Sequence, residues 1–181
     1  MENSNLYCEF VQNLPSDNVH RIYHDTEYGF PIYSDNELFG RLILEINQAG
    51  LSWDIILKKK ISFKKAFSNF NIQKIARYNN NKISELMNNA DIIRNKLKIN
   101  AVIYNANQIM ILQKKYGSFK NWLDQNSNLN LENWIKIFKI NFKFTGKEIT
   151  KEFLISTGYL DGAHHPKCQI YNLLIQKKHI G

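Results

Sequence analysis

Two cysteines and two histidines make up the most chemically specific set in the chain. Cys8 and His24 lie near the start, and His164 and Cys168 lie near the end with H-x3-C spacing. Two thiolates and two imidazoles suit tetrahedral Zn²⁺, and four protein ligands leave no open position for water. The pattern predicts a structural zinc that ties irregular termini together. The alternative is two free cysteines with scattered histidines, and His165 is a competing ligand next to His164.

A second candidate site lies in residues 42–53, which read LILEINQAGLSW. An apolar stripe at helical spacing runs through Leu38, Phe39, Leu42, Ile43 and Ile46. Glu45 falls on the shoulder of this stripe, at the border of the core, where a carboxylate needs a partner. The helix is expected to end at Gly50, and Ser52 can cap a new helix that carries Trp53. The segment could form one wall of a pocket, or it could be an ordinary helix boundary.

Aromatic residues flank the proposed ligands. Phe10 follows Cys8 by two positions and Tyr23 directly precedes His24, so a shared metal would bring both rings close together. Stacked aromatic rings and one carboxylate are suited to holding a base flipped out of DNA. For each aromatic residue taken singly, core packing is the alternative interpretation.

The charge balance favours a polyanionic partner. The 181 residues include 24 Lys and Arg against 16 Asp and Glu, and the isoelectric point is near 9.4. Residues 81–116 suggest a helix–hairpin–helix, a motif that binds the DNA backbone through N–H groups at a helix N-terminus. Phosphate contacts are expected around Ile93, with Arg94, Lys96 and Lys98. A solvated basic face is the alternative.

The elements that must position these residues are predicted to be helices. Helical periodicity recurs along the chain, and three prolines and eight glycines suit a bundle of short helices. Capping signals place helices at 15–28, 34–49, 52–60, 62–70, 71–78, 81–89, 95–116, 118–125, 131–140, 146–157 and 166–178. Residues 1–14 and 160–166 are expected to be irregular. The length fits one domain or two closely fused lobes.

Other features indicate the cellular setting. Two cysteines form no disulfide framework and favour a reducing compartment. The N-terminus is polar, without the apolar segment of a signal peptide, and no apolar run approaches the ~18 residues of a membrane span. We therefore expect a cytoplasmic protein with no membrane partner.

Several segments resemble the bacterial 3-methyladenine DNA glycosylase I family, within the helix–hairpin–helix glycosylases. They appear in the order typical of that family and cover nearly the whole chain. The matching segments are YHDxEYG at 23–29, Glu45 with QAGLSW at 48–53, IIR at 92–94 with Lys96 and Ile99, FKFxG at 142–146, and His164 with Cys168.

This resemblance implies an all-α, single-domain helix–hairpin–helix fold, with a lobe in which residues 1–30 and 160–181 meet around a structural zinc. By matching position it implies zinc ligands at Cys8, His24, His164 and Cys168, and a base pocket of Glu45, Tyr23, Trp53 and Phe10.

The implied activity is excision of 3-methyladenine from alkylated double-stranded DNA by a monomeric, monofunctional enzyme without a lyase step. Glu45 would be its one charged contact with the base. The alternative is a non-catalytic DNA-binding protein that keeps the hairpin and the zinc lobe. Three residues depart from the family pattern: tryptophan is common where Phe10 and Tyr28 stand, and glycine where Asp91 stands. Residues 161–163 also replace a more usual acidic–asparagine turn, which leaves His165 as an alternative to His164.

Overall fold

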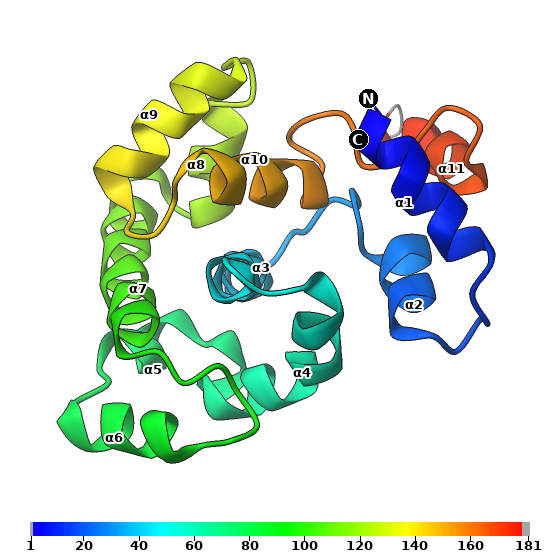
Figure 1. Cartoon of the computed structure of the whole chain (residues 1–181). Helices are drawn as coiled ribbons and strands as arrows, with labels where there is room; N and C mark the ends of the chain where they lie inside the picture. Colours follow the sequence, from blue (N-terminus) through cyan, green and yellow to red (C-terminus); the bar gives the residue numbers. More distant parts are fainter. Residues whose placement is uncertain (1, 179–181) are drawn as a thin grey trace. The chain divides into compact units, whose positions relative to one another are not determined.

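A computed structural model describes residues 2–178, and every regular element in that range is helical (Figure 1). This confirms the all-α prediction. The helices are α1 (Glu2–Gln12), α2 (Val19–Thr26), α3 (Asp35–Gln48), α4 (Trp53–Ala66), η1 (Ser68–Phe70), α5 (Ile72–Ala76), α6 (Asn80–Asn88), α7 (Lys96–Tyr116), α8 (Phe119–Gln125), α9 (Leu131–Asn141), α10 (Lys147–Ser156) and α11 (Gln169–Lys178). None of the described helices combines the length and apolarity that crossing a bilayer requires.

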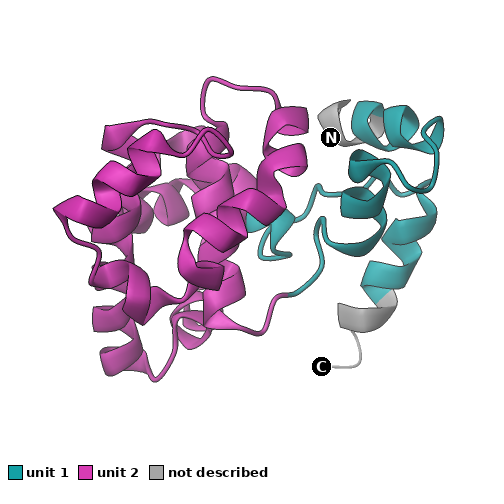
Figure 2. Ribbon diagram, turned by 90° about the horizontal axis from the view of Figure 1, so that it is seen from below, with its two compact units in different colours: residues 1–31, 154–181 teal, residues 32–153 magenta. Residues whose placement is uncertain are grey.

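The chain divides into two compact units (Figure 2). The first unit joins both ends of the chain, residues 1–31 and 154–181, and the second contains residues 32–153. In the first unit α1 packs on α2; in the second, α7 packs against α5, α6 and α8.

Helix α3 forms the centre of the second unit, where it contacts α4, α5, α7 and α8 (Figure 1). All ten residues from 38 to 47 are buried, so this part of the helix has no solvent face. Gly40 is required where Phe70 crosses the helix, because a Cβ at that position would lie 2.3 Å from the Phe70 ring. The apolar stripe predicted for this segment is therefore only part of its buried surface.

Asparagine side chains start many of the helices. The side-chain oxygen accepts a backbone N–H in the first turn, and so satisfies a donor that has no partner within the helix. The residues that cap in this way are Asn18, Asn71, Asn79, Asn95 and Asn130, together with Ser118. Ser34 and Ser52 occupy the expected N-cap positions, but their side chains make no capping hydrogen bond.

Two helix predictions are wrong. Residues 2–12 form a helix although their polar sequence suggested irregular structure; Cys8 and Val11, three residues apart, bury one face of it. Residues 52–70 do not form two helices of similar length, because α4 runs unbroken to Ala66. No glycine or proline interrupts that segment, and the buried side chains of Ile56 and Phe63 continue one face across the predicted break.

Asp35 connects three parts of the second unit. Its carboxylate accepts hydrogen bonds from the backbone N–H of Phe119 at 2.8 Å and of Lys120 at 2.9 Å, at the start of α8. It also accepts one from Nε2 of Gln113 in α7, at 2.7 Å. A single carboxylate at the start of α3 therefore caps α8 and anchors the end of α7.

We expect Asp35→Ala to lower the free energy of unfolding by about 1–3 kcal/mol, because three donors lose a charged acceptor. Thermal or urea unfolding measures this change. Asp124→Ala is the control, since it removes an exposed carboxylate that pairs with Lys120 within α8. Such a pair contributes less than about 1 kcal/mol. Equal losses in the two variants would contradict the role given to Asp35.

Candidate functional site

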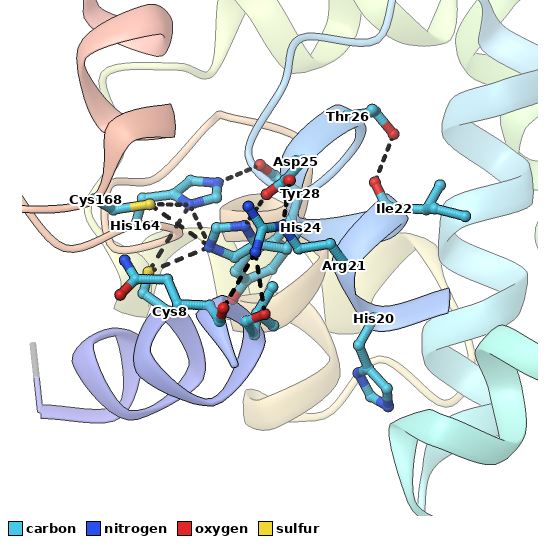
Figure 3. Close-up of polar contacts among 12 residues, drawn as sticks. Cys8, His20, Arg21, Ile22, His24, Asp25, Thr26, Tyr28, His164 and Cys168 are labelled. Atoms are coloured by element: carbon cyan, nitrogen blue, oxygen red, sulfur yellow. Dashed lines mark hydrogen bonds and ion pairs between the residues drawn. The ribbon is translucent and has the colours of Figure 1, made fainter. Parts of the chain in front are cut away.

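Four side chains from both ends of the chain converge in the first unit (Figure 3). Cys8 comes from α1, His24 from α2, His164 from the loop after α10, and Cys168 from the residue before α11. All four are buried, and their ligand atoms lie within 4.8 Å of one another. The cysteines are free thiols. The structure therefore brings together the set that the sequence pattern singled out.

The spacing of these atoms suits one tetrahedral ion. Nε2 of His24 lies 3.4 Å from Sγ of Cys8 and 3.7 Å from Sγ of Cys168, and 3.1 Å from Nδ1 of His164. Nδ1 of His164 lies 3.9 and 3.7 Å from the same two sulfurs. Bonds of about 2.0 Å to nitrogen and 2.3 Å to sulfur space tetrahedral ligands about 3.3–3.8 Å apart.

Both imidazoles are oriented by acceptors on their far side. Nδ1 of His24 lies 2.7 Å from a carboxylate oxygen of Asp25, and Nε2 of His164 lies 2.8 Å from the backbone oxygen of Tyr28 (Figure 3). Each far nitrogen must carry the proton, because its partner can only accept. The near nitrogens therefore turn lone pairs towards each other at 3.1 Å, which is favourable when a cation lies between them.

Asp25 is held in turn by Arg21. Nε of Arg21 donates to its second carboxylate oxygen at 2.6 Å. Burial alone would raise the pKa of Asp25, but the hydrogen bonds from His24 and Arg21 outweigh it and lower that pKa. Asp25 therefore stays ionised and fixes the ring of His24, as outer carboxylates do at metal centres. Neither residue was predicted to have a role: Asp25 directly follows the candidate ligand His24, and Arg21 lies one helical turn before Asp25.

Burial also affects the ligands themselves. Desolvation raises the pKa of the Cys8 thiol to about 11, with a further contribution from Cys168, and lowers the pKa of His164 to about 4. Without a cation the neutral forms of Cys8 and His164 are therefore favoured. A bound metal ion reverses this preference at the thiols, because it stabilises the thiolate.

Close backbone packing holds the carbonyl of Tyr28 in place. Gly29 has φ +78°, and a Cβ there would lie 2.5 Å from Cβ of Ala163. Its N–H donates to the backbone oxygen of Ser156 at 2.9 Å. The loop carrying His164 can therefore approach Tyr28 only because residue 29 is glycine. The cluster contains His164 and not His165, whose Nδ1 accepts the N–H of Lys167.

The aromatic residues of the first unit form a continuous chain. Phe10 stacks on Tyr7 at 6.4 Å, Tyr7 meets Tyr28 edge-on at 5.7 Å, and Tyr28 lies 5.5 Å from Tyr23. Tyr23 is 3% exposed and Phe10 is 50% exposed. The two predicted residues are thus linked through two tyrosines whose role the sequence analysis missed.

Glu45 and Trp53 lie in the second unit. Glu45 is 0% exposed on α3, deeper than the core border where the helical wheel placed it, because α3 is covered on all sides. Arg41, one helical turn earlier on the same face, is also buried. Trp53 is half-buried and is the first residue of α4, as predicted.

The end of α3 is held by a lysine from α7. Nζ of Lys98 donates to the backbone oxygens of Asn47 at 2.9 Å and Ala49 at 2.7 Å. Lys98 is 7% exposed, and burial lowers its pKa. The expectation that Lys98 contacts phosphate is therefore wrong, because its ammonium is buried in a structural contact.

The other predicted DNA contacts are Ile93 and Arg94, between α6 and α7, and Lys96, the first residue of α7. Arg94 and Lys96 are exposed, and Ile93 is half-buried. Asp91 does not adopt a left-handed backbone; the described non-glycine residues with positive φ are Ser68, Asn69, Phe70 and Phe144. Aspartate at this position therefore does not replace a left-handed glycine.

Comparison with known proteins identifies the family. The family model described as methyladenine glycosylase matches residues 13–137. A DNA-3-methyladenine glycosylase of Haemophilus influenzae is 37% identical over 101 residues, which are 56% of this chain and 55% of that protein. DNA-3-methyladenine glycosylase 1 of Escherichia coli is 34% identical over 112 residues, 62% of this chain and 58% of the relative. The matched part thus spans little more than half the length of these relatives.

Solved structures match over a longer range. A variant of 3-methyladenine DNA glycosylase I in complex with 3-methyladenine has a TM-score of 0.81 at 30% identity, covering 91% of this chain and 96% of that one. The 3-methyladenine DNA glycosylase I of Staphylococcus aureus has a TM-score of 0.79 at 30% identity, covering 86% and 93%. The chain belongs to the methyladenine glycosylase family.

Proposed function

We propose that this protein is a DNA glycosylase that hydrolyses the N-glycosidic bond of 3-methyladenine in alkylated double-stranded DNA. The observation that carries the proposal is the likeness, over 91% of the chain, to a glycosylase structure in complex with 3-methyladenine. We further propose that the base is flipped out of the helix and released without a lyase step.

The chemistry requires little from the protein. Methylation at N3 places positive charge on the purine and weakens its glycosidic bond, so the leaving group is already activated. The enzyme has to extrude the base, bind it selectively and stabilise cationic character in the transition state. A buried carboxylate can offset the positive charge of the base, and aromatic faces can stack on its ring.

We assign the charged contact to Glu45, whose carboxylate would accept from the amine edge of the base and offset its charge. Its complete burial supports this role, because a low local dielectric strengthens an interaction between opposite charges. Trp53, Tyr23 and Phe10 are proposed as stacking residues. A cation–π contact of this kind contributes roughly 0.5–2 kcal/mol.

We propose that the cluster of Cys8, His24, His164 and Cys168 holds a structural Zn²⁺. Two sulfurs, two nitrogens and the short ligand spacing are the donor set that zinc prefers, and the fixed far nitrogens of both histidines agree with it. When bound, the ion would supply folding energy to the first unit and take no part in bond cleavage.

We propose that the segment between α6 and α7 contacts the DNA backbone as a helix–hairpin–helix, through Ile93, Arg94 and Lys96. The side chain of Asn95 already accepts the N–H groups of residues 97 and 98, so side chains must supply most of this contact.

A second turn with basic residues joins α9 to α10. Phe144 is half-exposed at φ +58°, and Asn105 holds the neighbouring Lys143 by its N–H at 2.7 Å and its carbonyl at 3.0 Å. Lys143 in this turn and Lys147 at the N-terminus of α10 are both exposed. The second turn is therefore the competing candidate for the phosphate contact.

Prediction for activity: the protein releases free 3-methyladenine from methylated DNA and leaves an intact strand with an abasic site. Chromatography of released bases and gel analysis before alkaline treatment measure both products. We expect Glu45→Gln to lower the single-turnover excision rate roughly 10- to 100-fold, which is about 1.4–2.8 kcal/mol of transition-state stabilisation. Affinity for undamaged DNA should change less than about twofold.

Glu37→Gln is the matched control for that experiment, because it removes an exposed carboxylate from the first turn of the same helix. It should leave excision unchanged. Absence of released 3-methyladenine above background would refute the enzyme and favour a non-catalytic DNA-binding protein. Equal losses of excision and DNA affinity in Glu45→Gln would refute the role of Glu45.

Prediction for the metal: the purified protein contains one zinc per chain, and Cys168→Ser lowers this content well below one. Elemental analysis measures the metal, and thermal unfolding measures the accompanying loss of stability. His165→Ala is the control, because its ring lies outside the cluster, and it should remain fully metallated. Full metallation of Cys168→Ser would rule out the proposed ligand set.

Prediction for DNA contact: replacing Arg94 and Lys96 together by alanine weakens binding and lowers the slope of log K against log salt by about 2, because each phosphate contact contributes about 0.9. The double variant Lys143→Ala/Lys147→Ala tests the other turn at equal charge loss. Replacing Lys114 and Lys115 at the far end of α7 is the control. If the slope is unchanged in the Arg94/Lys96 variant and lower in the Lys143/Lys147 variant, the phosphate contact lies in the α9–α10 turn.

A further inference from the structure

We propose that Lys98 is a positioning residue that fixes the turn between Glu45 and Trp53 and thereby sets the rate of base excision. The effect on excision rests on the proposed function, whereas the effect on the turn is independent of it. The proposal starts from a lysine that is 7% exposed and makes two short hydrogen bonds to another helix.

The two carbonyls that Lys98 binds lie on either side of a structural boundary. Asn47 belongs to the last turn of α3, and Ala49 is the C-cap, where the backbone leaves the helix with ψ 117°. One ammonium at 2.9 and 2.7 Å therefore ties the end of the helix to the start of the turn. A cation is favoured there, because the carbonyl end of a helix carries partial negative charge.

Within the turn, the hydrogen bonds join residues that are close in sequence. Gly50 has φ +83°, and a Cβ on it would meet nothing within 4 Å. The N–H of Leu51 donates to the carbonyl of Gln48 at 2.7 Å, and the Gln48 side chain donates back to Leu51 at 3.1 Å. Ser52 makes no side-chain cap. These bonds are local, whereas Lys98 lies about fifty residues away and anchors the turn to α7.

The residues on both sides of this anchored turn are those proposed to bind the base. Glu45 precedes Asn47 by two positions in α3, and Trp53 follows Ala49 by four at the start of α4. If the ammonium is lost, the helix end and the turn can move separately. Small displacements of binding groups lower rates strongly, since catalysis depends on groups held in a fixed geometry.

The test uses Lys98→Met, which keeps the length of the buried stem and removes the ammonium. Amide hydrogen exchange of Leu51 reports the turn directly, because its N–H bond closes the turn. We expect this exchange to rise at least about tenfold, with amides in the middle of α7 unchanged. Lys114→Met is the matched control, since it removes an exposed lysine from the last turn of the same helix.

Excision is measured on the same variants under single-turnover conditions with saturating methylated DNA. We expect Lys98→Met to lower the rate at least about tenfold, to change affinity for undamaged DNA less than about twofold, and to be partly rescued by Lys98→Arg. If Lys98→Met does not fold, Lys98→Gln, which keeps a neutral donor, takes its place in both measurements.

Unchanged exchange at Leu51 overturns the proposal whatever the activity. Faster exchange with wild-type excision overturns the link to the reaction. If the wild-type protein releases no 3-methyladenine, the proposed function fails, and with it the link to excision. Exchange at Leu51 still decides whether Lys98 holds the turn.

Discussion

The first unit depends on four side chains that join chain segments far apart in sequence. Cys8 and His164 are separated by 156 positions, yet their ligand atoms lie 3.9 Å apart. The apolar core around them is small, with Val11, Tyr23 and Leu174 among its few buried large side chains. A metal ion that binds only the assembled set adds its binding free energy to folding. The outer hydrogen bonds of both histidines fix the orientation of the two rings, as a metal site requires.

The second unit is organised differently, around α3, whose residues 38–47 are buried on every side. Polar groups in a buried part of a helix lose their contact with water, which costs free energy unless each group forms a hydrogen bond or ion pair inside the protein. Asp35 is compensated by three donors at the start of α3, and Lys98 compensates two carbonyls at its end. Glu45 and Arg41 lie between these ends, both buried. Helix α3, which carries the proposed recognition residue Glu45, is therefore anchored at both ends by a charged side chain. At its start Asp35 accepts hydrogen bonds from α7 and α8, and at its end Lys98 of α7 donates to two of its carbonyls.

The cysteine and histidine spacing pointed to the four side chains that form the cluster, with His165 left open beside His164, because few residue types bind zinc and the chain has only two cysteines. Helix boundaries were also predictable where capping residues occur, as at Asn95. The contributions of Asp25 and the Tyr28 carbonyl were not, since they depend on which atoms meet after folding. The depth of Glu45 was missed for a similar reason: a helical wheel separates two faces, but α3 is covered on both. Helix α1 was missed because its sequence is mostly polar, and the face that carries Cys8 and Val11 becomes buried only when α1 packs on α2.

The basic residues at the start of α7 show how one local pattern acquires two roles. Arg94, Lys96 and Lys98 alternate along the sequence and looked equivalent as phosphate contacts. Residues two apart in a helix point about 200° away from each other, so Lys96 and Lys98 cannot share a face. Lys96 is exposed, whereas Lys98 is turned into the core against the end of α3. The formal charge of +8 therefore overstates the positive charge that is exposed to DNA, because it counts the buried Lys98. The first turn of α7 therefore exposes Lys96 to solvent and directs Lys98 to the end of α3, next to the turn between Glu45 and Trp53.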